Sequence, residues 1–153
     1  MTAADREAVA EIVSRVGNFS PSEIACALEL VDIYLANPSQ QDYRLLVAAD
    51  SAGGVCAYAC WGPTPMTRGT YDVYWMATRP DAQGQGYGRR LLRWIEHAVS
   101  DNGGRIILIE TSSKASYAAT AEFYRRMGYV EESRIRDFYD TGDDRLVFVK
   151  RFC

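Results

Sequence analysis

The sequence predicts a mixed α/β fold with a mostly antiparallel central sheet flanked by helices, and three observations support this. Two amphipathic segments precede the first strand, two β-rich segments then follow each other closely enough to form a hairpin, and a strand–helix–strand unit occupies the middle of the chain. Such a crossover joins parallel strands, so one parallel pair is expected. The chain has 153 residues, which fits a single domain spanning residues 1–153 with a real core.

Two helices are expected before the first strand. Asp5 to Val16 carries apolar side chains at helical spacing. The stretch FSPSE then starts a second helix, with Ser20 as the N-cap, Pro21 in the first helical position and Glu23 completing a capping box. This helix ends near Ala36, because an Asn-Pro pair follows it.

The next segments predict strands and a third helix. Tyr43 to Ala49 and Val55 to Trp61 are apolar and β-rich, and the turn sequence DSAGG joins them as an antiparallel hairpin. A third strand is expected from Tyr71 to Thr78. After a glycine-rich turn, an amphipathic helix follows and ends at the sequence Asn-Gly-Gly.

The C-terminal third predicts three strands and a helix. Arg105 to Glu110 reads RIILIE, whose consecutive apolar residues are typical of a central strand buried on both faces. A helix follows from about Tyr117 to Met127 and stops at Gly128. Two last strands, Tyr129 to Phe138 and Leu146 to Phe152, flank the turn sequence YDTGDD.

Composition narrows the functional classes. The net charge of −3 and the pI near 5.2 argue against binding to nucleic acid or to an anionic membrane. No apolar run approaches the roughly 20 residues that span a bilayer, and the N-terminal segment has no signal-peptide core, so a cytoplasmic protein is expected. With one histidine and four cysteines that form no CxxC pair, no metal site is expected.

Three glycines alternate between the third strand and the helix that follows it, at Gly84, Gly86 and Gly88. Glycine lets the backbone adopt positive φ and approach a ligand closely. Free N–H groups and the helix dipole then make a site suited to phosphate, and Arg89 and Arg90 add positive charge. Without further evidence, a tight turn that binds nothing is the alternative.

The residues around these glycines distinguish between phosphate-binding motifs. The dinucleotide fingerprint fails because Arg89 stands at its third glycine, and no Gly-Lys-Ser/Thr follows as in a P-loop. The turn fits the pattern Gln/Arg-x-x-Gly-x-Gly/Ala with Gln83, Gly86 and Gly88, and here the chain resembles the GNAT superfamily of N-acetyltransferases. The later segment AEFYRRMGY and the element order from Tyr43 to Phe152 resemble the same family.

This resemblance implies acetyl-CoA as co-substrate, with its diphosphate held on the main chain of the turn. The implied cofactor residues are Gln83, Gly84, Gln85, Gly86, Tyr87, Gly88 and Arg89, with Tyr117 beside the adenosine. In the family, the strand before the turn carries a bulge and splays from its parallel neighbour. Carried over, the backbone of Met76, Ala77 and Thr78 would hold the pantetheine and the acetyl oxygen. The family usually opens with a strand before its first helix, and here Asp5 comes too early for one.

The same resemblance supplies candidate catalytic residues. Tyr124 matches the family's tyrosine that protonates the coenzyme A thiolate, and a phenol can donate a proton without carrying charge. Asp72 and Glu110 are the candidate bases, with Asp72 slightly preferred, because apolar neighbours would raise its pKa. Either carboxylate could instead pair with an arginine or orient the substrate. His97 lies late in its helix and is rejected as the base.

We therefore expect an N-acetyltransferase that acetylates a primary amine by direct attack in a ternary complex. Two alternatives stay open: a non-catalytic acyl-CoA-binding regulatory module, and a protein or peptide N-acetyltransferase. The acidic sequence YDTGDD, with Asp72 and Glu110, favours a cationic amine, unless it is simply a solvated hairpin turn. The sequence leaves the acceptor, the acyl length and the oligomeric state open, a homodimer included.

Overall fold

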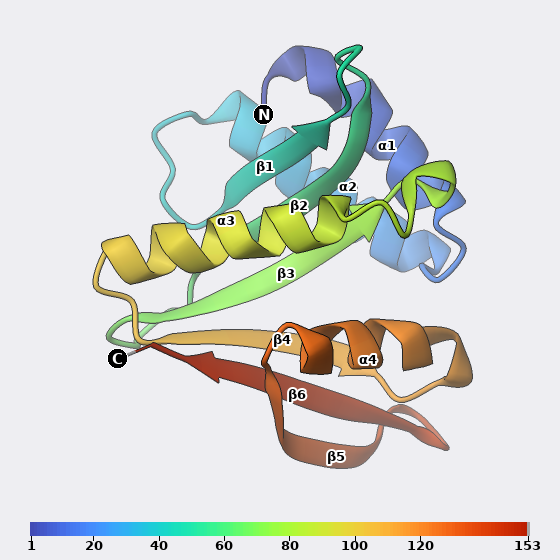
Figure 1. Cartoon of the computed structure of the whole chain (residues 1–153), viewed down its shortest axis with the longest axis vertical. Helices are drawn as coiled ribbons and strands as arrows, with labels where there is room; N and C mark the ends of the chain where they lie inside the picture. The colour runs from blue at the N-terminus through green and yellow to red at the C-terminus, as the bar shows by residue number, and fades with distance from the viewer. Residues whose placement is uncertain (153) are drawn as a thin grey trace.

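A six-stranded sheet forms the centre of the computed structural model, which describes residues 1–152; Cys153 lies outside the described part (Figure 1). The strand order is β1-β2-β3-β4-β6-β5, and only β3 and β4 pair in parallel, which confirms the predicted fold class. The strands are Arg44–Ala49 (β1), Val55–Pro63 (β2), Thr70–Thr78 (β3), Ile106–Ser112 (β4), Val130–Asp140 (β5) and Asp143–Arg151 (β6). The α-helices are Arg6–Arg15 (α1), Pro21–Ala36 (α2), Tyr87–Asp101 (α3) and Ala118–Arg126 (α4).

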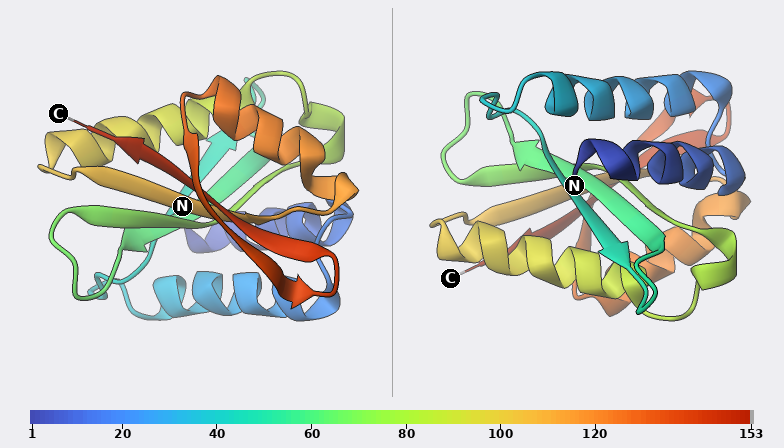
Figure 2. Two further views of the ribbon diagram at one scale, coloured as in Figure 1. Left: turned by 90° about the horizontal axis from the view of Figure 1, so that it is seen from below. Right: turned by 90° about the horizontal axis from the view of Figure 1, so that it is seen from above.

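Helices cover the sheet on both sides (Figure 2). α3 and α4 pack on one side, hereafter the α3/α4 face, over a core that includes Trp61, Ile95 and Phe148. α1 and α2 pack on the other, the α1/α2 face, over a second core that includes Tyr58 and Val31. Side chains alternate between the two faces along each strand. This alternation assigns every candidate site residue on a strand to one of the two faces.

The start of α2 illustrates how local sequence sets an element boundary. The Ser20 hydroxyl accepts a hydrogen bond from the Glu23 backbone N–H at 3.3 Å, and the Glu23 carboxylate accepts one from the Ser20 N–H at 2.7 Å. Pro21 occupies the first helical position, where no N–H is needed. The predicted capping box and both ends of this helix are therefore confirmed.

The parallel pair β3–β4 opens partway along its length. Residue pairs run from Thr70↔Ile106 to Val73↔Ile109 and then stop, although both strands continue. Figure 1 shows the two strands diverging beyond this point. We call residues 74–78 of β3 and 110–112 of β4 the strand opening.

A β-bulge lies at the position where this pairing ends. Against β2, Trp75 pairs with Cys60 and Val73 pairs with Trp61, which leaves Tyr74 as the extra residue. A bulge bends its strand and increases the local twist. The bend therefore turns β3 away from β4 at Tyr74.

The expectation for the middle of the chain needs revision, whereas the one for its start is confirmed. Ile107 and Ile109 of β4 are buried, but Glu110 is exposed and Leu108 only half-buried, so the strand is not buried on both faces. The reason is that α1 and α2 lie against β1, β2 and β3 and do not extend over β4. Within residues 1–152 no strand precedes α1, so the strand that usually opens the family's fold is missing from the described part.

The last hairpin also differs from its prediction. The sequence YDTGDD is not all turn, since β5 continues to Asp140 and β6 begins at Asp143. Gly142 adopts a φ of 78°, which lets the chain reverse within two residues. Asp143 and Asp144 therefore belong to a strand, where their side chains have fixed neighbours.

We expect Ser20→Ala to lower the free energy of unfolding by about 1 kcal/mol, because α2 loses the acceptor for one of its first N–H groups. Urea denaturation followed by circular dichroism measures the change. Ser14→Ala is the control, since its hydroxyl bonds the Ala10 carbonyl within α1 and caps nothing. Equal losses in the two variants would contradict the role given to the cap.

Candidate functional site

The glycine turn presents unpaired backbone N–H groups at the start of α3. Gly84 and Gly86 adopt φ values of 74° and 84°, and Gly86 is the N-cap without any side-chain capping bond. The first hydrogen bond of the helix runs from the Arg90 N–H to the Gly86 carbonyl at 3.0 Å. Within the described residues, no N–H from Gly84 to Arg89 donates a hydrogen bond to the protein. These donors and the helix dipole make the turn suitable for an anion.

Glutamine side chains fix the turn to the end of β3. The Gln83 amide donates to the Thr78 carbonyl at 3.3 Å, and the Gln85 amide donates to the Asp81 carbonyl at 3.0 Å. A Cβ at Gly88 would lie 3.5 Å from the Thr78 hydroxyl. The turn is thus held against the strand opening by its own side chains and by the close approach at Gly88.

Two side chains after the turn have different surroundings. The Tyr87 ring is buried, and the Arg90 guanidinium stacks over it at 4.4 Å. Arg89 is exposed, and no carboxylate in the described part of the chain pairs with it. Arg89 therefore adds uncompensated positive charge beside the N–H groups, whereas the Tyr87 ring packs beneath the Arg90 guanidinium.

The main chain of β3 has free hydrogen-bonding groups on its β4 side. The Arg79 N–H donates to the Cys56 carbonyl at 2.8 Å, which fixes the alternation of the antiparallel ladder with β2. By that alternation Ala77 bonds to β2, while the N–H and C=O groups of Met76 and Thr78 point toward the strand opening. Of the three predicted backbone positions, Met76 therefore presents a free donor and acceptor there, whereas Thr78 presents only its N–H because its carbonyl accepts from Gln83.

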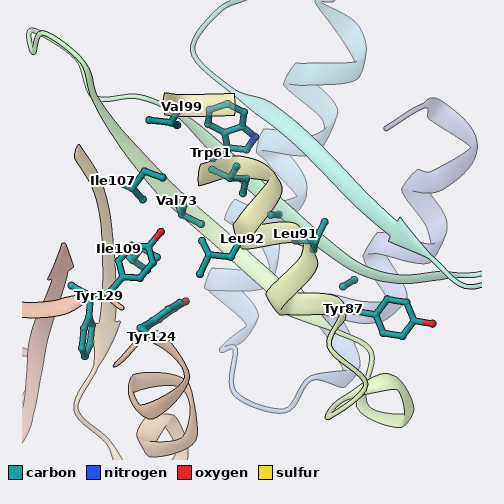
Figure 3. Close-up of a cluster of buried hydrophobic side chains, with 14 of the residues drawn as sticks. Trp61, Val73, Tyr87, Leu91, Leu92, Val99, Ile107, Ile109, Tyr124 and Tyr129 are labelled. Carbon is teal, nitrogen blue, oxygen red and sulfur yellow. The ribbon is translucent and has the colours of Figure 1, made fainter. Parts of the chain in front are cut away.

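Tyr124 lies on the α3/α4 face, the same side as the glycine turn. Its ring packs against Phe123, Tyr129 and Phe148 at centroid distances of 5.5, 6.2 and 5.7 Å. Figure 3 shows it reaching from α4 toward Leu92 of α3. Burial raises the pKa of the Tyr124 hydroxyl, with a smaller contribution from Tyr117, so the hydroxyl stays protonated throughout the neutral range.

The candidate bases both lie on the opposite side, the α1/α2 face. Asp72 pairs with Leu108 in the closed part of the sheet and accepts a 2.6 Å hydrogen bond from the Thr64 hydroxyl. Glu110 is the first β4 residue beyond the last β3–β4 pair. The geometry therefore brings Glu110, and not Asp72, to the strand opening.

Tyr117 connects two segments on the α1/α2 side. Its hydroxyl donates to the Asn18 carbonyl at 2.6 Å, which ties the α1–α2 loop to the start of α4. Burial, followed by the charges of Glu23 and Asp143 and by Tyr139, raises its pKa to about 12. Its role beside the adenosine stays a prediction, and the contact that the structure gives its hydroxyl is the one to Asn18.

The acidic residues near the last hairpin are compensated by basic ones. Asp143 is buried and accepts from the Ser112 hydroxyl at 2.5 Å, and the Lys114 ammonium lies 3.2 Å away. Although burial raises its pKa, these bonds hold the pKa of Asp143 below the usual range. Asp144 pairs with Arg134 at 3.2 Å. Two of the three aspartates of YDTGDD are therefore compensated, and only Asp140 of the three lacks a basic partner among the described residues, so the segment offers a cationic amine little free negative charge.

Sequence reasoning missed two residues at the strand opening. The bulge at Tyr74 has no local signal, because it depends on register with β2. Arg145 lies within 3.4 Å of Glu110 although the two are far apart in the chain. Its only sequence signal is its position just before the predicted strand from Leu146.

Two hollows elsewhere on the surface have other linings. One of about 200 Å³ lies between β1 and α3, and one of about 290 Å³ lies beside His97 and Lys150. Neither contains a residue of the glycine turn or the strand opening. Among residues 1–152, no cluster of three or more His, Cys, Asp or Glu side chains could hold a metal ion, and no helix is long and apolar enough to cross a bilayer.

Comparisons with known proteins agree on one family. A family model described as an acetyltransferase (GNAT) domain matches residues 41–131. A solved structure from Desulfovibrio desulfuricans, assigned to the GNAT acetyltransferases, is 39% identical with a TM-score of 0.92, covering 97% of this chain and 93% of the other.

Two curated relatives match a shorter stretch. The S-(2-succino)cysteine N-acetyltransferase of Bacillus subtilis is 29% identical over 60% of this chain. The L-methionine sulfoximine/L-methionine sulfone acetyltransferase of Pseudomonas aeruginosa is 33% identical over 60% of it. Each match covers 53% of the relative, so the chain spans about half the length of these proteins.

Proposed function

The chain belongs to the GNAT family of acetyltransferases, and from this premise we propose that it transfers an acetyl group from acetyl-CoA to a primary amine. The observation that carries the proposal is the run of unpaired N–H groups from Gly84 to Arg89 beside the strand opening. We further propose that residues 1–153 act as one catalytic domain.

In this proposal the glycine turn and β3 bind different parts of acetyl-CoA. The N–H groups from Gly84 to Arg89 would hold the diphosphate, with Arg89 adding charge. The free main-chain groups of Met76 and the free N–H of Thr78 would hold the amides of the pantetheine arm, as an added strand does. Bound in this way, acetyl-CoA supplies an activated acetyl group on a thioester.

The reacting groups lie on opposite faces of the sheet. Tyr124, on the α3/α4 face, would donate its proton to the leaving sulfur, a role that its buried, neutral hydroxyl suits. Glu110, on the α1/α2 face, would accept the proton of the amine, and Asp72 would have a structural role through Thr64. The two faces of the sheet are connected at the strand opening. Because Glu110 lies on the α1/α2 face, the amine would approach from that side.

Direct attack by the amine is favoured over an acyl-enzyme. None of the described cysteines lies in β3 or β4: Cys56 and Cys60 are buried in β2, and Cys26 is on α2. Burial, together with a smaller effect of Cys26, raises the pKa of the Cys60 thiol to about 12, which keeps it un-ionised. No described cysteine is therefore a candidate for a nucleophilic thiolate beside β3 and β4.

The acceptor is proposed to be a small molecule. The acceptors in the names of the two curated relatives are amino acids or their derivatives, and these relatives match about 60% of this chain. The alternatives are a peptide or protein acceptor and a non-catalytic acyl-CoA-binding module. A module would bind the cofactor without needing Tyr124 or Glu110.

We expect Gly86→Ala to weaken coenzyme A binding roughly tenfold or more, because an L side chain at a φ of 84° reorients the N–H groups that bind the diphosphate. Isothermal titration calorimetry measures the Kd. Gly103→Ala is the control, since Gly103 has a φ of 72° at the other end of α3 and its Cβ would meet nothing within 4 Å. The same loss of affinity in both variants would refute the assignment of the turn.

Replacing Tyr124 by Phe should lower kcat about 100-fold and leave the Kd of coenzyme A unchanged, because only proton donation is removed. Thiol release from acetyl-CoA with a panel of amines provides the rate. Tyr129→Phe is the matched control, as its ring lies in the same cluster and its hydroxyl is also buried. A wild-type protein that binds coenzyme A but releases no thiol with any amine would favour the non-catalytic module.

Glu110→Gln should lower kcat/KM about 100-fold near neutral pH, with the loss decreasing as rising pH deprotonates the amine in solution. Asp72→Asn, measured in the same assay, should change the rate far less, because Asp72 lies in the closed part of the sheet. A larger effect of Asp72→Asn would transfer the role of base to that residue.

A further inference from the structure

Of the three guanidiniums on the last hairpin that pair with a carboxylate, Arg145 uses the fewest of its hydrogen-bond donors. A guanidinium has five N–H donors. Arg145 makes one long contact, 3.4 Å from Nη1 to the Glu110 carboxylate, and its Nε is buried without a partner. By contrast, Arg134 bonds both Glu131 and Asp144, and Arg151 makes two bonds to Glu132 of 2.7 and 3.0 Å.

The position of Arg145 is fixed by the sheet. It pairs with Ser112 at the end of β4, and strand alternation places its side chain on the α1/α2 face together with that of Glu110. The Phe138 ring stacks on the guanidinium at 4.2 Å. Its charge is therefore held at the strand opening, on the side from which the amine is proposed to approach.

An exposed tyrosine completes this group. The Tyr139 side chain is 46% exposed and makes no hydrogen bond with the described residues. Burial and the Glu110 carboxylate raise the pKa of the Tyr139 hydroxyl, while Arg145 lowers it. The Tyr139 ring packs edge-on against Phe138 at a centroid distance of 4.9 Å, and Phe138 is the ring that stacks on Arg145.

We propose that Arg145 binds a carboxylate of the acceptor, and that the acceptor is a free α-amino acid; this inference rests on the proposed acetyl transfer. An α-amino acid carries its amine and carboxylate on one carbon, which matches a carboxylate and a guanidinium in contact with each other. A guanidinium binds a carboxylate through two parallel N–H bonds, which uses donors that Arg145 leaves free.

The pairing also explains how Glu110 can serve both as a neighbour of Arg145 and as a base. When the acceptor carboxylate binds the guanidinium, Arg145 no longer has to neutralise Glu110. Glu110 can then take a proton from the amine on the same carbon. An amine without a carboxylate would leave the Arg145–Glu110 contact intact and would be a poorer acceptor.

The test compares L-α-amino acids with their α-carboxamides as acceptors, using thiol release from acetyl-CoA. We expect the wild-type protein to have a kcat/KM for the acids at least about tenfold above that for the amides, the effect of one charge-assisted hydrogen-bonding contact. Arg145→Gln should abolish this preference by slowing the acids and not the amides. Arg145→Lys should restore part of it, because the ammonium keeps the charge but not the bidentate geometry.

Controls separate this inference from the proposed function. Arg134→Gln, on the neighbouring strand, should keep the preference for acids, and thermal melts identify any variant that fails to fold. Equal rates with acids and amides in the wild-type protein, faster acetylation of peptide N-termini, or parallel losses with both acceptors in Arg145→Gln would overturn the role of Arg145 and leave acetyl transfer standing. Absence of thiol release with every amine would overturn the proposed function itself.

Discussion

The end of hydrogen bonding between β3 and β4 is the feature on which the rest of the site depends. The two strands pair only as far as Val73 and Ile109, and the bulge at Tyr74 turns β3 away. Beyond that point the backbone of β3 keeps polar groups that no neighbouring strand satisfies, in a sheet where such groups are otherwise paired. The glycine turn follows the same strand after the short 3-10 helix Pro80–Ala82, so two sets of free N–H groups, those of β3 and those of the turn, lie on one stretch of the chain.

This opening also connects two faces that the sheet otherwise separates. Tyr124 and the glycine turn lie on the α3/α4 face, while Glu110 and Arg145 lie on the α1/α2 face. In the proposed transfer, a donor for the leaving sulfur and an acceptor for the amine proton on opposite faces can reach the same thioester and amine only where the two strands part. The division therefore gives each group its own environment: a buried, neutral phenol on one side and an exposed carboxylate on the other.

The ion pairs around the strand opening differ in how closely their partners are held. Asp143 is held firmly by Ser112 and Lys114, which ties the end of β4 to β6. Glu110 and Arg145 are only loosely associated, at 3.4 Å. The close contacts of Asp143 stabilise the pairing of β4 with β6. The long Glu110–Arg145 contact leaves the guanidinium available to a ligand, because exchanging one long hydrogen bond for another partner costs little free energy.

Local patterns in the sequence determined the elements and the turn. The capping box at Ser20 and Glu23, the alternating glycines and the helical spacing of α3 all act over a few residues, so helix bounds and the positive φ at Gly84 and Gly86 could be predicted. Tertiary structure decided what depends on register and on neighbours. The bulge at Tyr74, the exposure of Glu110, the partners of Asp143 and the contact of Arg145 with Glu110 arise from strands distant in sequence, whose pairing no local pattern specifies.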